Sequence, residues 1–163
     1  FKRFTTPEEV ASASVREIGT FIKSVGLWTS KARNIKKACA MLVRDSNSTV
    51  PASMNDLIRL PGVGRKTANV VLHAGFQKNE GIAIDTHNQR LAVRLGLTKE
   101  KNPKKIERGL MQQIPQKEWG LFSILLVHHG RAICTARNPQ CAACILNKLC
   151  PSAFTFSRNV KNT

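Results

Sequence analysis

The sequence lacks tyrosine altogether, and aromatic residues make up only 6% of its 163 residues. Proteins that bind nucleic acid by stacking its bases depend on exposed aromatic side chains, so the composition argues against that class of binder. No apolar run approaches the roughly 20 residues that a membrane-spanning helix needs. The first residues, FKRFTTPEEV, also lack the apolar stretch and cleavage site of a secretory signal peptide. We therefore expect an intracellular protein with no membrane partner.

Acidic residues are scarce as well. Ten Asp and Glu stand against 26 Lys and Arg, which gives a formal net charge of +16 at pH 7. The positive charge is spread along the chain rather than confined to one tail. Such a charge is typical of domains that bind nucleic acid, because their cations replace the counterions of phosphates. A charge that serves only solubility, or a ribosome-like environment, is the alternative.

Helical patterns dominate the rest of the sequence, without a convincing strand pair or tandem repeat. Thr6 with Glu9 and Ser14 with Glu17 have the spacing of capping boxes, and we expect Gly26 to end the second helix. A hydrophobic content of 42% supports one compact unit or two small ones. The sequence therefore predicts an all-α fold. Further helices are predicted to begin at Ser30, Ser53, Gly64, Thr86 and Asn102, and a long one over about residues 116–131.

A short glycine-bearing turn joins two of the predicted helices. In LPGVGRKTANVVL, Gly62 and Gly64 remove side chains where a ligand backbone would approach, and they allow positive φ. The N–H groups at the start of the second helix would suit one phosphate, bound regardless of base sequence. An ordinary corner between two helices is the alternative.

Lys66 lies at the start of that second helix, where the helix dipole disfavours a cation. The helix is mostly apolar, and Lys66, Asn69 and His73 form one polar stripe at spacings of three and four. We expect this lysine to be half buried, with a lowered pKa that favours the free amine, the form that attacks carbon. A lysine that binds phosphate fits the local residues equally well.

Asp85 follows the apolar run Ile82–Ile84 and directly precedes a predicted helix. We expect Thr86 and Gln89 to form the capping pair of that helix, which leaves Asp85 without an obvious structural role. A carboxylate at the edge of a core can stabilise developing positive charge or move a proton. On the residues alone, a second capping acceptor is the favoured alternative.

Four of the five cysteines crowd into residues 134–150. Without a secretory signal, such a group is typical of a metal site rather than of disulfides. Four thiolates suffice for a tetrahedral zinc or a 4Fe-4S cluster, and ligand type alone does not decide between them. Cys39 lies on the apolar stripe of a predicted helix, so we expect a small core residue there. The candidate metal ligands are Cys134, Cys141, Cys144 and Cys150.

Taken in order, these motifs resemble the endonuclease III family of helix-hairpin-helix DNA glycosylases. The resemblance is carried by LPGVGRKTANVVL, IAIDTHNQR, HHGRAIC and the cysteine spacing, over nearly the whole chain. It implies an all-α helix-hairpin-helix glycosylase fold with a C-terminal 4Fe-4S cluster loop. The implied domains are a helical-barrel part with the hairpin over residues 1–79 and a helical domain with the cluster loop over 80–153. A tail over 154–163 follows.

The resemblance also implies a bifunctional DNA glycosylase and abasic-site lyase of base excision repair that removes oxidised pyrimidines. Lys66 would attack C1′ of a flipped-out nucleotide as the nucleophile, Asp85 would be the catalytic carboxylate, and β-elimination would cut the strand 3′ to the abasic site. The four cysteines would ligate a 4Fe-4S cluster, with zinc less favoured. The implied partner is double-stranded DNA with damaged pyrimidines or abasic sites, bound by a monomer. The implied DNA-binding residues are Pro61, Gly62, Val63, Gly64, Arg65 and Arg137.

The chain departs from the family pattern in several places. Family members carry further helices before the point that matches Phe1, so we expect an N-terminally truncated form that keeps the lysine chemistry but binds damaged DNA poorly. Asn88 and Gln89 stand where apolar residues are common, and His73 stands where asparagine is usual. Two alternatives follow: a non-catalytic or weakly active DNA-binding fragment, and a monofunctional mismatch glycosylase, against which Lys66 argues. The expected location is with DNA, in the bacterial cytoplasm and nucleoid or in a eukaryotic nucleus or mitochondrion.

Overall fold

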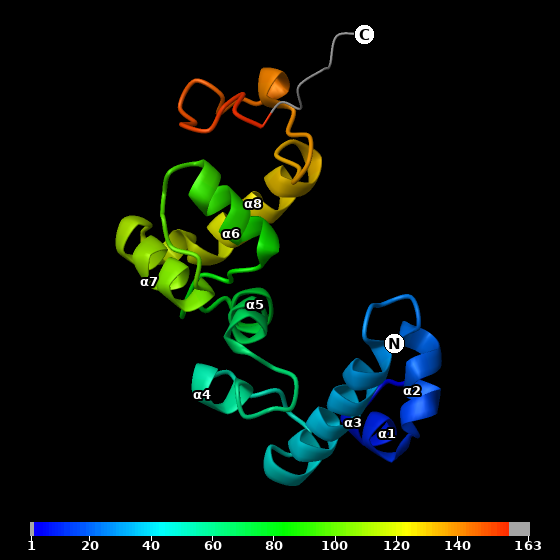
Figure 1. The fold of residues 1–163 in the computed structure, drawn as a ribbon. Helices are drawn as coiled ribbons and strands as arrows, with labels where there is room; N and C mark the ends of the chain where they lie inside the picture. Colours follow the sequence, from blue (N-terminus) through cyan, green and yellow to red (C-terminus); the bar gives the residue numbers. More distant parts are fainter. Residues whose placement is uncertain (1, 157–163) are drawn as a thin grey trace, which may run out of the picture. The chain divides into compact units, whose positions relative to one another are not determined.

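The computed structural model describes residues 2–156 and divides the chain into two compact units, residues 1–68 and 69–163. All regular structure in the described residues is helical, which confirms the predicted fold class (Figure 1). None of the helices described is both long and apolar enough to span a bilayer. The domain boundary after residue 79 stays a prediction, and residues 157–163 of the expected tail lie outside the described residues.

The first unit is built on three helices that pack together. Buried Ala13, Ile18 and Ala32 form their shared core. Two predicted N-terminal caps are confirmed, since Thr6 accepts from the Glu9 amide and Ser14 accepts from the Glu17 amide. The helices of this unit are α1 (Pro7–Ser12), α2 (Val15–Ile22), α3 (Trp28–Asp45) and the short α4 (Met54–Leu57).

The junction between α2 and α3 differs from the prediction. Helix α2 ends at Ile22, so Gly26 is not its C-cap, and α3 begins before Ser30. The left-handed residue is Leu27, with φ of 58°, rather than the glycine. Tertiary packing explains the earlier start, because a Cβ on Gly19 would lie only 2.4 Å from the Trp28 ring. The junction is therefore fixed by an aromatic side chain that packs onto the neighbouring helix.

Helix α5 (Arg65–Phe76) begins in the first unit and continues into the second. In the second unit, α6 packs against both α7 and α8 (Figure 1). The remaining helices are α6 (Thr86–Arg94), α7 (Pro103–Gln113), the 3-10 turn η1 (Gln116–Glu118), α8 (Trp119–Ala132) and the 3-10 turn η2 (Cys141–Ala143). Their core consists of Ile82, Ile84, Ala92, Ile106, Leu110 and Trp119.

Candidate active site and cysteine-lined pocket

The turn before α5 is held by its own backbone. The Val63 amide donates to the Leu60 carbonyl at 3.0 Å. Pro61 and Gly62 occupy the two central positions, and Gly62 has φ of +80°, the pattern of a type II turn. A Cβ on Gly62 would lie 2.8 Å from the Asn34 Cβ of α3. Glycine is therefore needed at position 62 both for the turn and for packing against α3.

Gly64 is placed differently from Gly62. Gly64 does not have a positive φ. Among the described residues, the glycines with positive φ are Gly62 and Gly96. A Cβ on Gly64 would meet nothing within 4 Å among the described residues. Its carbonyl accepts from the Ala68 amide at 2.9 Å, so α5 starts immediately afterwards. Gly64 is exposed, so a ligand can approach its backbone without meeting a side chain.

The structure places the side chains of Arg65 and Lys66 on the surface. The expectation that Lys66 is half buried is wrong. The buried face of α5 carries Ala68 and Leu72, both 0% exposed. Lys66 precedes Ala68 by two residues, about 200° around the helix, so its side chain points away from Ala68 and is exposed in the first turn.

The other two members of the polar stripe make structural contacts within the second unit. Asn69 is only 4% exposed and donates from Nδ2 to Glu107 Oε1 of α7 at 2.8 Å. His73 Nδ1 lies 3.1 Å from Asn79 Oδ1, which also accepts from the Gly120 amide of α8. Glu107 lies 38 residues beyond Asn69, and Asn79 lies in the loop after α5, so helical spacing alone could not reveal either partner.

Asp85 is the N-cap residue of α6. Its Oδ1 accepts from the amides of His87 and Asn88 at 2.8 and 2.9 Å. The expected capping pair of Thr86 and Gln89 is therefore wrong, because Thr86 is already the first helical residue. Aspartate and threonine are both good N-cap residues, which explains why the sequence left the choice ambiguous. The half-buried carboxylate uses one oxygen for the cap, and Oδ2 takes no part in it.

All four cysteines of residues 134–150 line one pocket, as predicted from their crowding. The pocket holds about 420 Å³ of space free of protein atoms, part of it open to solvent. Within the described residues, no group of three or more His, Cys, Asp and Glu side chains is arranged to hold a single metal ion. Four thiols that line one pocket supply the ligand set of an iron–sulfur cluster or of a tetrahedral zinc ion.

Two arginines of α6, which the sequence did not single out, contact this loop. Arg90 Nη2 donates to the carbonyls of Gly130 and Cys134 at 2.9 and 3.0 Å. Burial and, next, the charge of Arg94 lower the pKa of Arg90. Arg94 donates to the same loop one turn later. The only advance signal is their spacing of four residues, which puts both guanidinium groups on one face of the helix.

Cys39 lies in the first unit, on α3, and is half buried rather than in the core. Burial raises the pKa of its thiol, so the protonated form is favoured at neutral pH. A protonated thiol is a poor metal ligand and a poor nucleophile. Cys39 is therefore only partly packed into the core where it was expected, and its exclusion from the metal ligands stays a prediction.

Comparisons with known proteins agree with this geometry. Residues 1–116 match the HhH-GPD superfamily of base excision DNA repair proteins. An endonuclease III of Synechocystis sp. is 48% identical over 153 residues, which cover 94% of this chain and 70% of the relative. The chain belongs to the endonuclease III family. It is accordingly a base excision repair enzyme, a DNA glycosylase and abasic-site lyase.

Further matches cover the cysteine loop and nearly the whole chain. Residues 134–150 match the iron-sulfur binding domain of endonuclease III, so this member of the family carries such a domain. The endonuclease III of Bacillus subtilis is 39% identical over 151 residues, or 92% of this chain and 68% of the relative. A solved structure described as a trapped endonuclease III–DNA covalent intermediate is 40% identical, with a TM-score of 0.90. The match covers 97% of this chain and 74% of that one. The family and the fold inferred from the sequence motifs are confirmed.

Proposed function

We propose that this member of the endonuclease III family is bifunctional: it removes oxidised pyrimidines and then cuts the strand 3′ to the abasic site by β-elimination. The observation that carries the proposal is the position of Lys66, an exposed primary amine in the first turn of the helix that follows the hairpin. A related protein has been trapped as a covalent intermediate with DNA. A lysine amine is the type of nucleophile that forms such an adduct with a sugar.

The proposed reaction requires the damaged nucleotide to leave the duplex, because C1′ is inaccessible within the stack. The free amine of Lys66 attacks C1′, and the bond to the base breaks. The base leaves with the electron pair and takes up a proton, while the lysine nitrogen loses one. The sugar ring then opens at the C1′–O4′ bond, O4′ takes up a proton, and the Schiff base forms. Loss of a proton from C2′ expels the 3′ phosphate oxygen, and water finally releases the lysine.

Asp85 is proposed as the carboxylate that assists these proton transfers and stabilises the positive charge that develops on the sugar. The half-buried Asp85 is suited to this task, because only Oδ1 is used in the cap of α6. The cap itself fixes the direction of the carboxylate.

The proposed partner is double-stranded DNA with damaged pyrimidines or abasic sites, bound by a monomer. The hairpin turn of residues 61–64 and Arg65 would hold a backbone phosphate at the start of α5. The open space around Gly64 supports this assignment. Arg137, exposed between Cys134 and Cys141, would contact a second phosphate. Such contacts are independent of base sequence, as repair at any site requires. A location with the cell's DNA follows from this partner.

The proposed cofactor is a 4Fe-4S cluster held by Cys134, Cys141, Cys144 and Cys150. Support comes from the match of residues 134–150 and from the four thiols around one pocket. When bound, the cluster would cross-link a segment that has little regular structure of its own. Its role would be to hold the basic loop rigid, and no step of the proposed reaction uses it.

Borohydride trapping on abasic-site DNA tests the nucleophile. The unmodified chain should give a covalent adduct, which Lys66→Gln and Lys66→Arg should lose by at least about a thousandfold. Lys66→Arg is the matched control, since it keeps a cation at the helix start but removes the nucleophilic amine. Base release without any adduct would indicate a monofunctional mismatch glycosylase, and DNA binding without either activity would indicate a non-catalytic module.

Asp85→Asn provides a second arm of the same experiment. Asparagine caps a helix about as well as aspartate, so α6 should lose little stability while the charge at this site disappears. We expect adduct formation to slow by about a hundredfold or more, the size of a general acid–base contribution. An unchanged rate in a folded variant would mean that Asp85 is only a cap.

A further inference from the structure

Arg94, the last residue of α6, is a charged side chain with only 8% of its surface exposed. A buried guanidinium is costly unless its donors are satisfied. Arg94 lies in the second unit beside the cysteine-lined pocket, which it helps to line. The active-site proposal leaves this residue without a role.

Both terminal nitrogens of the Arg94 guanidinium reach one end of the cysteine loop. Nη1 donates to the Thr135 carbonyl at 2.7 Å and to the Cys134 Sγ at 3.3 Å. Nη2 donates to the Ala136 carbonyl at 2.8 Å. The planar group is therefore used as a fork, which a lysine ammonium would not reproduce.

The backbone of Arg94 contacts the other end of the loop. The Cys150 Sγ lies 3.4 Å from the Arg94 carbonyl oxygen, which places the last cysteine beside α6; as a cluster ligand it would be a thiolate and would not donate to this carbonyl. The Phe156 ring, six residues beyond Cys150, covers the guanidinium, with its centroid 4.1 Å from Cζ. One residue of α6 thus touches both the first and the last of the four cysteines and the segments next to them.

We propose that Arg94 is a positioning residue for the iron–sulfur centre. Arg94 holds the two ends of the cysteine loop against α6, and its guanidinium donates a hydrogen bond to the Cys134 sulfur. This inference rests on the proposed cluster. Closing the loop slows the release of iron, because the first and last ligands cannot leave independently. A hydrogen bond to the sulfur withdraws electron density from the thiolate, so it favours the reduced form and raises the reduction potential.

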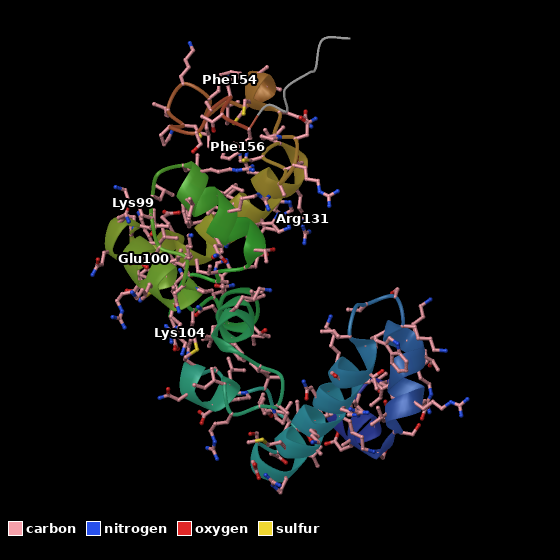
Figure 2. The ribbon with its side chains drawn as sticks, viewed as in Figure 1. Lys99, Glu100, Lys104, Arg131, Phe154 and Phe156 are labelled. Atoms are coloured by element: carbon pink, nitrogen blue, oxygen red, sulfur yellow. The ribbon has the colours of Figure 1, made fainter. Side chains whose placement is uncertain are left out.

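The test measures the cluster rather than DNA cleavage. Full-length protein is purified under anaerobic conditions as the unmodified chain, Arg94→Gln, Arg94→Lys and Arg131→Gln. Iron and sulfide content, the rate of iron release to a chelator and the midpoint potential of the cluster are determined for each. Arg131 is the matched control, because it is an exposed arginine in the last turn of α8, close in sequence to Cys134 (Figure 2).

We expect Arg94→Gln to release iron at least about tenfold faster than the unmodified chain, the lower end of the usual effect of residues that orient metal ligands. Its midpoint potential should be lower, because the hydrogen bond to Cys134 is lost. The iron-release rate and the midpoint potential of Arg94→Lys should lie between those of Arg94→Gln and the unmodified chain, because lysine keeps the positive charge but not the two-pronged donor. Arg131→Gln should match the unmodified chain in both measurements.

Arg94→Lys keeps the test decisive if Arg94→Gln fails to fold. An iron-release rate and a potential in Arg94→Lys equal to those of the unmodified chain would overturn the inference. So would equal effects of Arg94→Gln and Arg131→Gln, because a loss of any nearby charge would then explain them. An unmodified chain without iron and sulfide would instead contradict the proposed cluster, which distinguishes the two failures.

Discussion

The buried side chain of Asn88 forms a hydrogen bond through its amide nitrogen but, within the part of the chain that the structure describes, not through its amide oxygen. It is 1% exposed, and its Nδ2 donates to the Ala83 carbonyl. That carbonyl also accepts from the Ser123 hydroxyl at 3.2 Å. Among the described residues, Asn88 Oδ1 has no hydrogen-bond partner. A buried acceptor without a partner costs about 1–3 kcal/mol, so this buried amide is expensive for the fold.

Asn88→Leu is therefore expected to raise the free energy of unfolding by about 1 kcal/mol. Leucine has nearly the same branched shape, and the Ala83 carbonyl keeps its hydrogen bond from Ser123. Urea denaturation followed by circular dichroism measures the change. Asn88→Ala serves as the control and should be less stable than the unmodified chain, because it leaves a cavity. Destabilisation by Asn88→Leu would mean that the amide is better satisfied than this geometry indicates.

At the scale of helices, α5 is joined to α7 by the buried contact between Asn69 and Glu107. Gly81, at the start of the segment that leads to α6, leaves the room for this contact. A Cβ there would lie 2.2 Å from Glu107 Oε1 and 2.8 Å from Asn69 Nδ2. The packing of two helices thus depends on a glycine that belongs to neither.

We expect Gly81→Ala to lower the free energy of unfolding by about 2 kcal/mol, since the added methyl group pushes apart a buried polar pair. Gly109→Ala is the matched control. This glycine lies within α7, and a Cβ there would meet nothing within 4 Å of the described residues. Alanine should stabilise that helix by up to about 1 kcal/mol. Thermal unfolding measures both changes, and a neutral effect of Gly81→Ala would contradict the tight packing around Asn69.

At the scale of the whole molecule, local signals in the sequence predicted far more than distant contacts. Thr6 and Ser14 were correctly predicted as caps, because a cap depends on residues three positions away. The exposure of Lys66 was not predicted, since helical spacing does not reveal which face of α5 is packed. The same holds for Arg94, whose loop partners lie about 40 residues further along the chain. Tertiary partners at such separations leave no periodic pattern to find.

The net charge of +16 belongs to the whole chain, but only cations that touch phosphates should affect how DNA binding responds to salt. We expect Arg65→Gln and Arg137→Gln each to weaken binding of undamaged duplex regardless of sequence. Each should also reduce the slope of log K against log salt concentration by about 0.9, and the double variant by about twice that amount. Lys23→Gln, which removes an exposed cation after α2, is the control and should leave the slope unchanged. Fluorescence anisotropy over a salt series gives the slopes. If the double variant keeps the slope of the unmodified chain, neither arginine contacts a phosphate and the proposed interface lies elsewhere on the protein.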